Sequence, residues 1–322
     1  MGNPIFAYIA HQQGAIDDSA SELAQAAAKI DPAAEATAIV AGSGADLKAA
    51  CDQAAKVYKT VWMLDNEACA YPNAEVIRRA LVTILPENAT LLVSHGTFGM
   101  DLSPGLAVKL NAAFVSDVVA VEDSTSEQLT VVRQEFGGQV SSHMTVDTQN
   151  GAVVNIRPGV FTPTETETSG AIEDKSDQLG DLTAGRRFLE VVEAEMGDVD
   201  ITKEDVLVSV GRGIEDEDNL EIAQDLAEAM GAAVSCSRPI VDAKWLEKSR
   251  QVGTSGQTVS PKVYLACGIS GSFQHMGGLK GNPFIVAINK NAKAPIFQMA
   301  DVGIVTDILD FLPELTDSIN DL

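Results

Sequence analysis

Residues 267–278, CGISGSFQHMGG, surround a single histidine with glycines and serines, and apolar runs precede and follow them. A strand that runs into this stretch predicts a helix beginning near Ser270, whose backbone N–H groups would point at an anion. The glycines allow a ligand to approach the backbone closely. His275 has four possible roles: metal ligand with Cys267, catalytic base, packing residue or cofactor contact. A metal site would need further ligands that the neighbouring sequence does not supply.

The segment SRPIVDAKWLEKSRQVGTSGQT (237–258) places Arg238, Arg250 and Ser255 on irregular backbone in an acidic protein. Guanidinium groups pair with phosphate by both charge and geometry. The arginines therefore favour an anionic ligand, and surface ion pairs with the abundant Asp and Glu are the alternative interpretation.

The stretch SVGRGIED (209–216) stands where a strand should end, a common ligand position in open α/β sheets. It does not match the dinucleotide-binding fingerprint, because Asp216 occupies the third glycine position. The sequence contains no GxxxxGK[ST] motif, which disfavours a P-loop kinase or ATPase. Alone, GRG (211–213) fits a tight turn as well as a phosphate contact.

Composition limits the classes of function. The net charge of −24 argues against nucleic-acid binding, since phosphate contacts need clustered Lys and Arg. The chain is 45% hydrophobic and 21% charged, and no apolar run approaches the roughly 20 residues of a membrane helix, so we expect a globular protein without membrane insertion. The N-terminus lacks a basic start and a signal-cleavage site, so the expected location is cytoplasmic.

The cysteines and the other histidines give weaker signals. No CxxC or zinc-type spacing occurs, which predicts buried free thiols and no metal site. The cysteines are Cys51, Cys69, Cys236 and Cys267. The three histidines of the first half, which we expect to be structural or surface residues, are His11, His95 and His143.

The first half of the chain alternates extended apolar runs with helix patterns. Strands are predicted at 5–10, 36–42, 60–64 and 89–94, and helices at 17–30, 45–57, 73–85 and 105–114. This alternation predicts a parallel sheet covered on both faces. Shorter, hairpin-like segments follow at 115–122, 129–136, 141–147 and 152–158.

A change in composition then suggests a domain boundary. The segment 162–181 is acidic and almost free of aliphatic residues, as in a linker or a surface excursion. We place the first domain at 1–203, with the acidic linker near 162–203, and the second at 204–322. The second domain again alternates strands and helices, with strands near 205–214, 232–240, 262–270 and 283–290, and helices at 219–231 and 304–319.

Four blocks of the second domain resemble the alpha subunit of electron transfer flavoprotein in their order and spacing. They are SVGRGI, CSRPIVDAKWLEKSRQVGTSGQT, YLACGISGSFQHMGGLKG and IVAINKNAKAPIFQMADVGIVTDIL, and together they cover nearly all of 206–315. In the first domain, FVSDVVAVE is similar to the family's N-terminal domain. The resemblance implies an α/β protein of two domains: a mostly parallel N-terminal α/β domain for subunit assembly and a flavodoxin-like or Rossmann-like C-terminal domain that binds FAD.

The resemblance also implies a heterodimer with a beta subunit. Such a protein takes electrons from dehydrogenases and passes them to a quinone-linked or other redox acceptor, as an electron carrier without catalytic residues of its own. The implied cofactor-binding residues are Arg212, Ser237, Arg238, Gln251, Val252, Gly253, Thr254, Ser255, Gly268, Ser270, Gly271, Gln274, His275, Asn289, Lys290, Asp307 and Ile308.

Family positions give several of these residues an expected role at the flavin. Arg238 would lie beside the isoalloxazine, where a fixed cation favours negative charge on the flavin and raises its potential. The hydroxyl of Ser255 would bond flavin N5. His275 would face the O2 side as a proton donor, with Gln274 supporting the cofactor beside it.

Other residues are expected at the rest of FAD. Arg212 and the stretch from Ser270 would contact the pyrophosphate or its vicinity. The adenosine half would be surrounded by Asn289, Lys290 and Asp307, with Asp307 accepting from hydroxyl groups.

One run departs from the family pattern. The common family run is Gln-Val-Gly-Gln-[Thr/Ser]-Gly-Lys, whereas residues 251–257 read QVGTSGQ. Thr254 replaces a longer amide and Gln257 replaces a cation, so the flavin potential is expected to differ from the family's usual range.

Two other functions remain open from the sequence alone. The first is an electron-bifurcating flavoprotein, in which the beta subunit holds a second FAD in place of AMP. The second is a nucleotide-binding module without redox chemistry.

Overall fold

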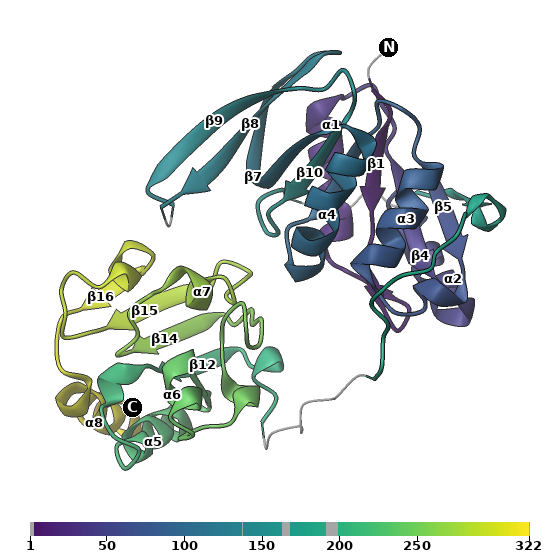
Figure 1. Ribbon diagram of the computed structural model, residues 1–322. Coiled ribbons are helices and arrows are strands. Elements are labelled where there is room, and N and C mark those ends of the chain that lie inside the picture. Colours follow the sequence, from purple (N-terminus) through teal and green to yellow (C-terminus); the bar gives the residue numbers. More distant parts are fainter. Residues whose placement is uncertain (1–2, 137, 163–167, 191–198, 322) are drawn as a thin grey trace. The chain divides into compact units, whose positions relative to one another are not determined.

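The computed structural model describes residues 3–136, 138–162, 168–190 and 199–321 (Figure 1). Backbone contacts divide the chain into two compact units, Met1–Glu190 and Val191–Leu322. Each unit has its own principal sheet and its own hydrophobic core. The domain boundary after residue 203 stays a prediction.

A nine-stranded sheet forms the centre of the N-terminal unit, in the order β11-β5-β4-β1-β6-β10-β7-β8-β9. Neighbours from β11 to β7 pair in parallel, while β7, β8 and β9 pair antiparallel. The strands are β1 (Ile5–Tyr8), β4 (Thr37–Gly42), β5 (Thr60–Asp65), β6 (Thr90–Ser94), β7 (Ala113–Ser124), β8 (Gln128–Glu135), β9 (Val140–Asp147), β10 (Ala152–Ile156) and β11 (Ala171–Asp174). A separate small hairpin joins β2 (His11–Gln12) to β3 (Ala15–Ile16).

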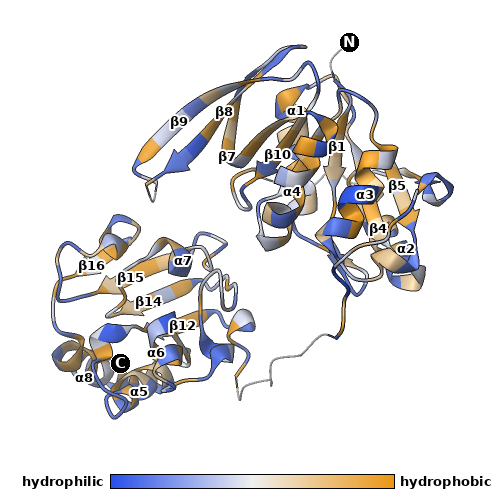
Figure 2. Cartoon of the chain, in the orientation of Figure 1, coloured by the Kyte–Doolittle hydropathy of each residue, from blue (hydrophilic) through white to orange (hydrophobic). Residues whose placement is uncertain are grey.

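Helices cover both faces of this sheet, as the alternation predicted (Figure 1). Side chains on a strand alternate between faces, so Ile5 and Ala7 pack with α1 (Ser19–Ile30) and α2 (Gly44–Ala54), whereas Phe6 and Tyr8 pack with α3 (Ala74–Ile84) and α4 (Thr97–Leu110). Figure 2 shows hydrophobic colouring along β5, in which Val61 and Leu64 are buried.

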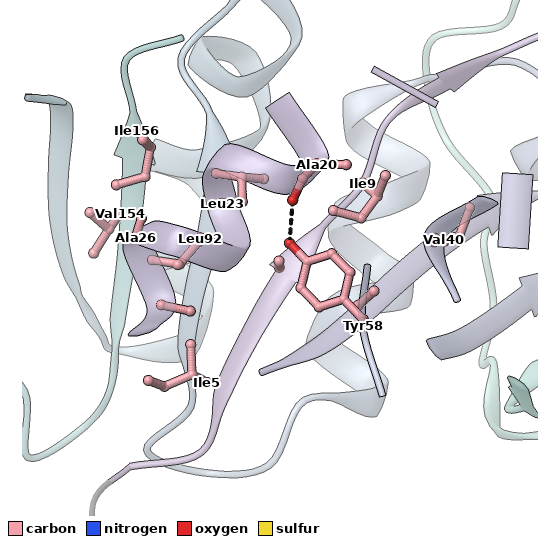
Figure 3. Packing of buried hydrophobic residues seen from close by; sticks show 14 of the residues in the cluster. Ile5, Ile9, Ala20, Leu23, Ala26, Val40, Tyr58, Leu92, Val154 and Ile156 are labelled. Atoms are coloured by element: carbon pink, nitrogen blue, oxygen red, sulfur yellow. Dashed lines mark hydrogen bonds between the residues drawn. The ribbon is translucent and has the colours of Figure 1, made fainter. Parts of the chain in front are cut away.

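The first of these two cores contains a buried tyrosine with a satisfied hydroxyl. Tyr58 is 3% exposed, and its hydroxyl donates to the carbonyl oxygen of Ala20 at 2.7 Å (Figure 3). The bond joins the end of the segment after α2 to the first turn of α1.

Three segments of the N-terminal unit differ from the sequence predictions. The helix predicted at 105–114 begins earlier, at Thr97. The prediction placed its start too late because the first turns contain glycine and proline, which are unfavourable in helices and mask the helix pattern. The segment predicted as hairpin-like at 152–158 forms β10, which pairs in parallel with β6 and β7. Within the acidic segment, β11 extends the sheet by pairing with β5, although all four of its residues are exposed.

The C-terminal unit has a five-stranded parallel sheet in the order β13-β12-β14-β15-β16. In chain order this is 2-1-3-4-5, the flavodoxin-like order, so the predicted fold class is confirmed. The strands are β12 (Val206–Val210), β13 (Ala233–Cys236), β14 (Val263–Cys267), β15 (Phe284–Ile288) and β16 (Val302–Ile304).

The two faces of this smaller sheet are covered differently. One face packs against α5 (Leu220–Met230) and α8 (Ile308–Asn320), next to the short α6 (Arg238–Asp242). The other is covered by loops that contribute Val252, Val259 and Ile296, together with the short α7 (Phe273–Met276).

Helix α7 begins later than the sequence predicted. Its N-cap is Ser272 rather than a residue near Ser270, since Gly271 has a φ of +79° that a right-handed helix does not allow.

Candidate cofactor-binding site

A pocket of about 540 Å³ lies at the carboxyl ends of β12 and β14. These two strands are neighbours at the centre of the sheet, and the chain leaves them toward opposite edges. Such a point is a topological switch point, where the loops diverge and leave a crevice for a ligand. SVGRGI and CGISGS each follow a strand, as the sequence predicted, and the structure places the two strand ends side by side at this pocket.

Glycines let the two strand-end loops touch. The N–H of Gly211 donates to the carbonyl of Cys267 at 2.9 Å, and the N–H of Gly213 donates to that of Gly268 at 3.1 Å. A Cβ on Gly213 would lie 2.6 Å from the Gly268 Cα, a distance that no side chain tolerates. GRG is therefore a tight turn that fits against the second loop and also presents Arg212 to the pocket.

Most of the residues predicted from the sequence line this pocket. They are Arg212, Ser237, Arg238, Gln251, Val252, Gly253, Thr254, Ser255, Gly268, Ser270, Gln274, His275 and Asn289. An adjoining pocket of about 360 Å³ shares Arg212, Gly268 and Asn289 with the first and is also lined by Lys290, Asp307 and Ile308. The two pockets together form one elongated site.

Gly271 lines neither pocket. A Cβ there would lie 2.4 Å from the backbone nitrogen of Ile296, whose N–H donates to the carbonyl of Ser270 at 3.0 Å. The structure therefore gives Gly271 a packing role between two loops of the site.

The loop 251–255 is fixed on two sides. Gln251 is 4% exposed, and its side-chain amide donates to Ser255 Oγ at 3.0 Å. The N–H of Thr254 donates to the carbonyl of Gln274 at 2.8 Å, which ties the loop to α7. Because Ser255 Oγ accepts from Gln251, the hydroxyl proton of Ser255 is available for a ligand.

Two arginines give the pocket its positive charge. Arg212 is exposed and forms no ion pair with any residue that the structure describes. Arg238 Nε lies 3.4 Å from Asp242 Oδ2, and both side chains are more than half exposed, so the pairing is weak. Arg250 is not brought to the pocket: its Nη1 donates to the carbonyl of Val234, and it lines a different cavity.

Comparison with known proteins shows the family of the chain. A family model described as the electron transfer flavoprotein FAD-binding domain matches residues 200–280, and one described as the electron transfer flavoprotein domain matches residues 5–178. The chain belongs to the electron transfer flavoprotein alpha-subunit family. The pockets at β12 and β14 accordingly lie in its FAD-binding domain.

Relatives in the same family match over most of the chain. The electron transfer flavoprotein subunit alpha of Methylophilus methylotrophus is 39% identical over 70% of this chain and 70% of its own. Protein FixB of Clostridium saccharobutylicum is 32% identical over 79% and 78%. The subunit LctC of lactate dehydrogenase (NAD(+),ferredoxin) from Acetobacterium woodii is 32% identical over 76% of this chain, which spans 58% of that relative.

The second pocket of the FAD-binding domain has its polar groups partly engaged. Lys290 forms an ion pair with Glu215. Asp307 caps α8 by accepting from the N–H of Leu309 at 3.1 Å. Asn289 uses both ends of its amide, because its Nδ2 donates to the Ile269 carbonyl and its Oδ1 accepts from the N–H of Asn291. Ile308 is buried behind Gly268 and is a packing residue.

His275 is one of the buried polar groups of the first pocket. It is 5% exposed, and its Nε2 lies 2.7 Å from the Tyr264 hydroxyl, which in turn donates to Ser209 Oγ at 2.7 Å. Burial lowers the pKa of His275 to about 4, and the Val252 backbone opposes that shift. His275 Nδ1 is buried and has no hydrogen-bond partner of ordinary geometry among the described residues.

The donor set fits FAD. A pyrophosphate needs a cation, and Arg212, which forms no ion pair with a described residue, would supply one. A flavin edge needs a few polar groups, and Ser255 and His275 would supply them. Nδ1 of His275 has no hydrogen-bond partner among the described residues, and it belongs to a residue that lines the pocket, so a bound molecule could supply that partner.

The sequence did not single out several residues of the site. Tyr264 and Ser209 are polar residues on apolar strands, and that contrast was the signal that could have revealed them. The segment after β15 also contributes Asn291, Ala294 and Pro295 to the pocket.

Two further observations concern the whole chain. All four cysteines are buried free thiols, as predicted, and burial raises their pKa values to about 11 or 12. None of the described helices has the length and apolar character that crossing a membrane requires.

Proposed function

We propose that this chain is the FAD-carrying alpha subunit of a heterodimeric electron transfer flavoprotein. With its beta subunit it accepts electrons from dehydrogenases and passes them to a quinone-linked or other redox acceptor. The observation that carries the proposal is the pocket at the β12–β14 switch point. It combines a serine hydroxyl with a free proton, an arginine without an ion pair and a buried imidazole nitrogen without a hydrogen-bond partner, both absences being among the residues that the structure describes. FAD, when bound, supplies reversible transfer of one or two electrons.

Arg212 and the Ser270 loop bind the pyrophosphate in this proposal. Arg212 is exposed at the point where the two pockets meet, so its guanidinium reaches the link between the two halves of an elongated ligand. The adenosine half takes the second pocket, where one oxygen of Asp307 is left over from capping α8 and can accept from a ribose hydroxyl.

Ser255 donates to flavin N5. Its hydroxyl oxygen already accepts from Gln251, and this bond orients the free proton toward the pocket. The loop that carries Ser255 is tied to α7 through Thr254, so the donor is held in place before the cofactor binds. The backbone bonds of Gln257 close the same loop, since its N–H donates to the Gln251 carbonyl at 2.7 Å and its carbonyl accepts from Gly253 at 3.2 Å.

Arg238 and Asp242 set the charge beside the isoalloxazine. A fixed cation stabilises negative charge on the flavin and raises its potential. Asp242, which the sequence did not single out, lies 3.4 Å from Arg238 and offsets part of that effect. The net influence of the pair is therefore smaller than that of an isolated arginine.

The test is co-expression with the beta subunit followed by cofactor analysis. A yellow heterodimer with a flavin absorption spectrum, whose flavin is released by acid as FAD, is the expected result. The Arg212→Ala heterodimer, purified in parallel, should retain less FAD. A colourless heterodimer of correct stoichiometry would contradict the proposal and favour a nucleotide-binding module without redox chemistry.

A second candidate is a role in electron bifurcation, with a second FAD on the beta subunit. The similarity to a subunit of lactate dehydrogenase (NAD(+),ferredoxin) favours it, because that name pairs NAD(+) with ferredoxin. The flavin count per heterodimer separates the two functions. One FAD together with AMP supports the simple carrier, whereas two FAD molecules support bifurcation.

A further inference from the structure

A chain of three buried polar side chains runs from the sheet to the pocket. Ser209 on β12 and Tyr264 on β14 are fully buried, and His275 on α7 is 5% exposed. Tyr264 donates to Ser209 Oγ at 2.7 Å, and the same Tyr264 oxygen lies 2.7 Å from His275 Nε2. The parallel pairing of β12 with β14 sets Tyr264 beside Leu207, so Ser209, two residues further along β12, lies on the same face of the sheet as Tyr264.

The hydrogen atoms in the two bonds that join Ser209, Tyr264 and His275 can be assigned by counting the protons that each group can donate. A tyrosine hydroxyl has one proton, and Tyr264 gives it to Ser209. The bond between Tyr264 and Nε2 must then use a proton of the imidazole, so His275 is protonated at Nε2. In a neutral imidazole, the other nitrogen is an acceptor. Nδ1 of His275 therefore carries a lone pair.

This assignment differs from the role expected from the sequence. There, His275 was a proton donor to the flavin in its resting form. With the lone pair on Nδ1, the neutral ring donates only to Tyr264, and Nδ1 becomes a donor only after it has bound a proton.

The surroundings of His275 favour its neutral form as long as no negative charge develops in the pocket. Burial lowers its pKa to about 4, and no charged side chain among the described residues contributes to that shift. The titratable group in contact with it is Tyr264, whose own pKa is raised by burial. The Val252 backbone favours the imidazolium but does not offset burial. A negative charge developing in the pocket would add to that contribution and favour proton uptake.

We infer that Ser209 and Tyr264 are positioning residues that hold His275 in the Nε2–H tautomer and so make Nδ1 the atom that binds a proton beside the cofactor. The assignment of the tautomer is independent of the bound molecule, while the proton uptake rests on the proposed function. The proton comes from solvent and adds to the Nδ1 lone pair, and no covalent bond to the cofactor forms.

The tautomer is measured on the full chain with ¹⁵N-labelled histidine. The chain has only four histidines, so the ring nitrogens of His275 can be assigned with a His275→Gln sample. We expect a protonated Nε2 and an unprotonated Nδ1 at neutral pH. A protonated Nδ1 in the wild-type chain would overturn the assignment.

Variants test the positioning role. Ser235 on β13 has a buried hydroxyl without a hydrogen-bond partner among the described residues, and it lies close enough to Tyr264 to affect the pKa of that phenol. Its oxygen can therefore take the tyrosine proton when Ser209 is absent. In Ser209→Ala/Ser235→Ala, Tyr264 has neither acceptor and should donate to Nε2, which moves the imidazole proton to Nδ1. Ser235→Ala alone should leave the tautomer unchanged. An unchanged tautomer in the double variant, or a changed one in Ser235→Ala, would overturn the role given to Ser209.

The proton uptake is tested in the FAD-loaded heterodimer before and after full reduction by dithionite. We expect His275 Nδ1 to gain a proton on reduction in the wild type. If the heterodimer binds FAD and Nδ1 stays unprotonated, the inference fails while the proposed function stands. If no flavin binds, the proposed function fails, and the tautomer measurement on the full chain is unaffected.

Discussion

The side-chain amide of Gln251 donates to Ser255 Oγ at 3.0 Å across the loop that lines the cofactor pocket. Gln251 is buried and Ser255 is exposed, so the fixed side chain of Gln251 restricts the position of the Ser255 hydroxyl. The bond leaves the serine with a single free proton and fixes the position of its oxygen. Ser255 is thereby oriented before any ligand binds.

Removing that bond should weaken FAD binding without abolishing it. In Gln251→Ala the serine hydroxyl is free to rotate, and a hydrogen bond contributes about 0.5–1.5 kcal/mol, so we expect the Kd for FAD to rise roughly three- to tenfold. The Kd is measured by titrating the apo heterodimer with FAD and following the quenching of the flavin fluorescence. Gln257→Ala is the matched control, because Gln257 closes the loop through its backbone. Equal Kd values for Gln251→Ala and the wild type would contradict the role of this bond.

Arg212→Ala should have a larger effect on the same Kd. A charge-assisted bond to a phosphate contributes about 1.5–3 kcal/mol, so the Kd should rise at least about tenfold, and the salt dependence of binding should become weaker. Lys262→Ala removes a lysine of the same domain that is paired with Asp205 at the surface, and should leave the Kd unchanged. A similar loss in both variants would mean that net charge rather than a specific contact matters.

Arg238→Ala and Asp242→Ala should shift the flavin potential in opposite directions. Loss of the cation lowers the potential and loss of the carboxylate raises it. An interaction between exposed charges contributes at most about 1 kcal/mol, so we expect each single variant to shift the flavin potential by at most about 40 mV for one electron. Reductive titration against a reference dye measures the potential, and the double variant should lie near the wild type. Shifts of the same sign in both single variants would place the pair away from the flavin.

Local patterns in the sequence were sufficient to predict most of the strands, but not β11 or β16. Apolar runs followed by glycines marked β12 and β14, and the pocket lies where both runs end. What the sequence did not provide is the pairing of residues from different strands. Tyr264 meets Ser209 only because β14 pairs with β12, and the residues are 55 positions apart in the chain.

The same limit explains the other differences. Strand β11 forms because the backbone of β5 pairs with it in parallel, although the four residues of β11 are exposed. Arg250 and Arg238 belong to one irregular segment, yet the backbone turns between them, so that Arg250 faces Val234 and another cavity. Sequence spacing on irregular backbone does not determine the direction of a side chain.

Gly271→Ala should destabilise the C-terminal unit more than Gly231→Ala. Both glycines have positive φ angles, which cost an alanine about 1–2 kcal/mol. A Cβ at Gly231 meets open space, whereas one at Gly271 would lie 2.4 Å from the Ile296 nitrogen. We expect a loss of at least about 3 kcal/mol for Gly271→Ala, measured by denaturant unfolding. Equal losses of unfolding free energy in the two variants would mean that the loops containing Gly271 and Ile296 can move apart without loss of stability.

Buried His275 should make the stability of the apo chain depend on pH. Its pKa is lowered to about 4 in the folded chain from an ordinary value near 6.5, so below pH 6.5 the unfolded state binds a proton that the folded state does not. Stability from this residue is therefore fully present above about pH 6.5 and is lost as pH falls toward 4. Between pH 7 and pH 5 the loss should be about 2 kcal/mol.

The measurement compares denaturant unfolding at pH 7 and pH 5 in His275→Gln and in the wild type. Glutamine does not titrate, so the change in unfolding free energy between the two pH values should be smaller in the variant by about 2 kcal/mol. His143→Gln is the control, because His143 is exposed and paired with Glu122 in the other unit. If His275→Gln keeps the full pH dependence, the ring is solvated in the apo chain, and its nitrogens are not held between Tyr264 and the pocket.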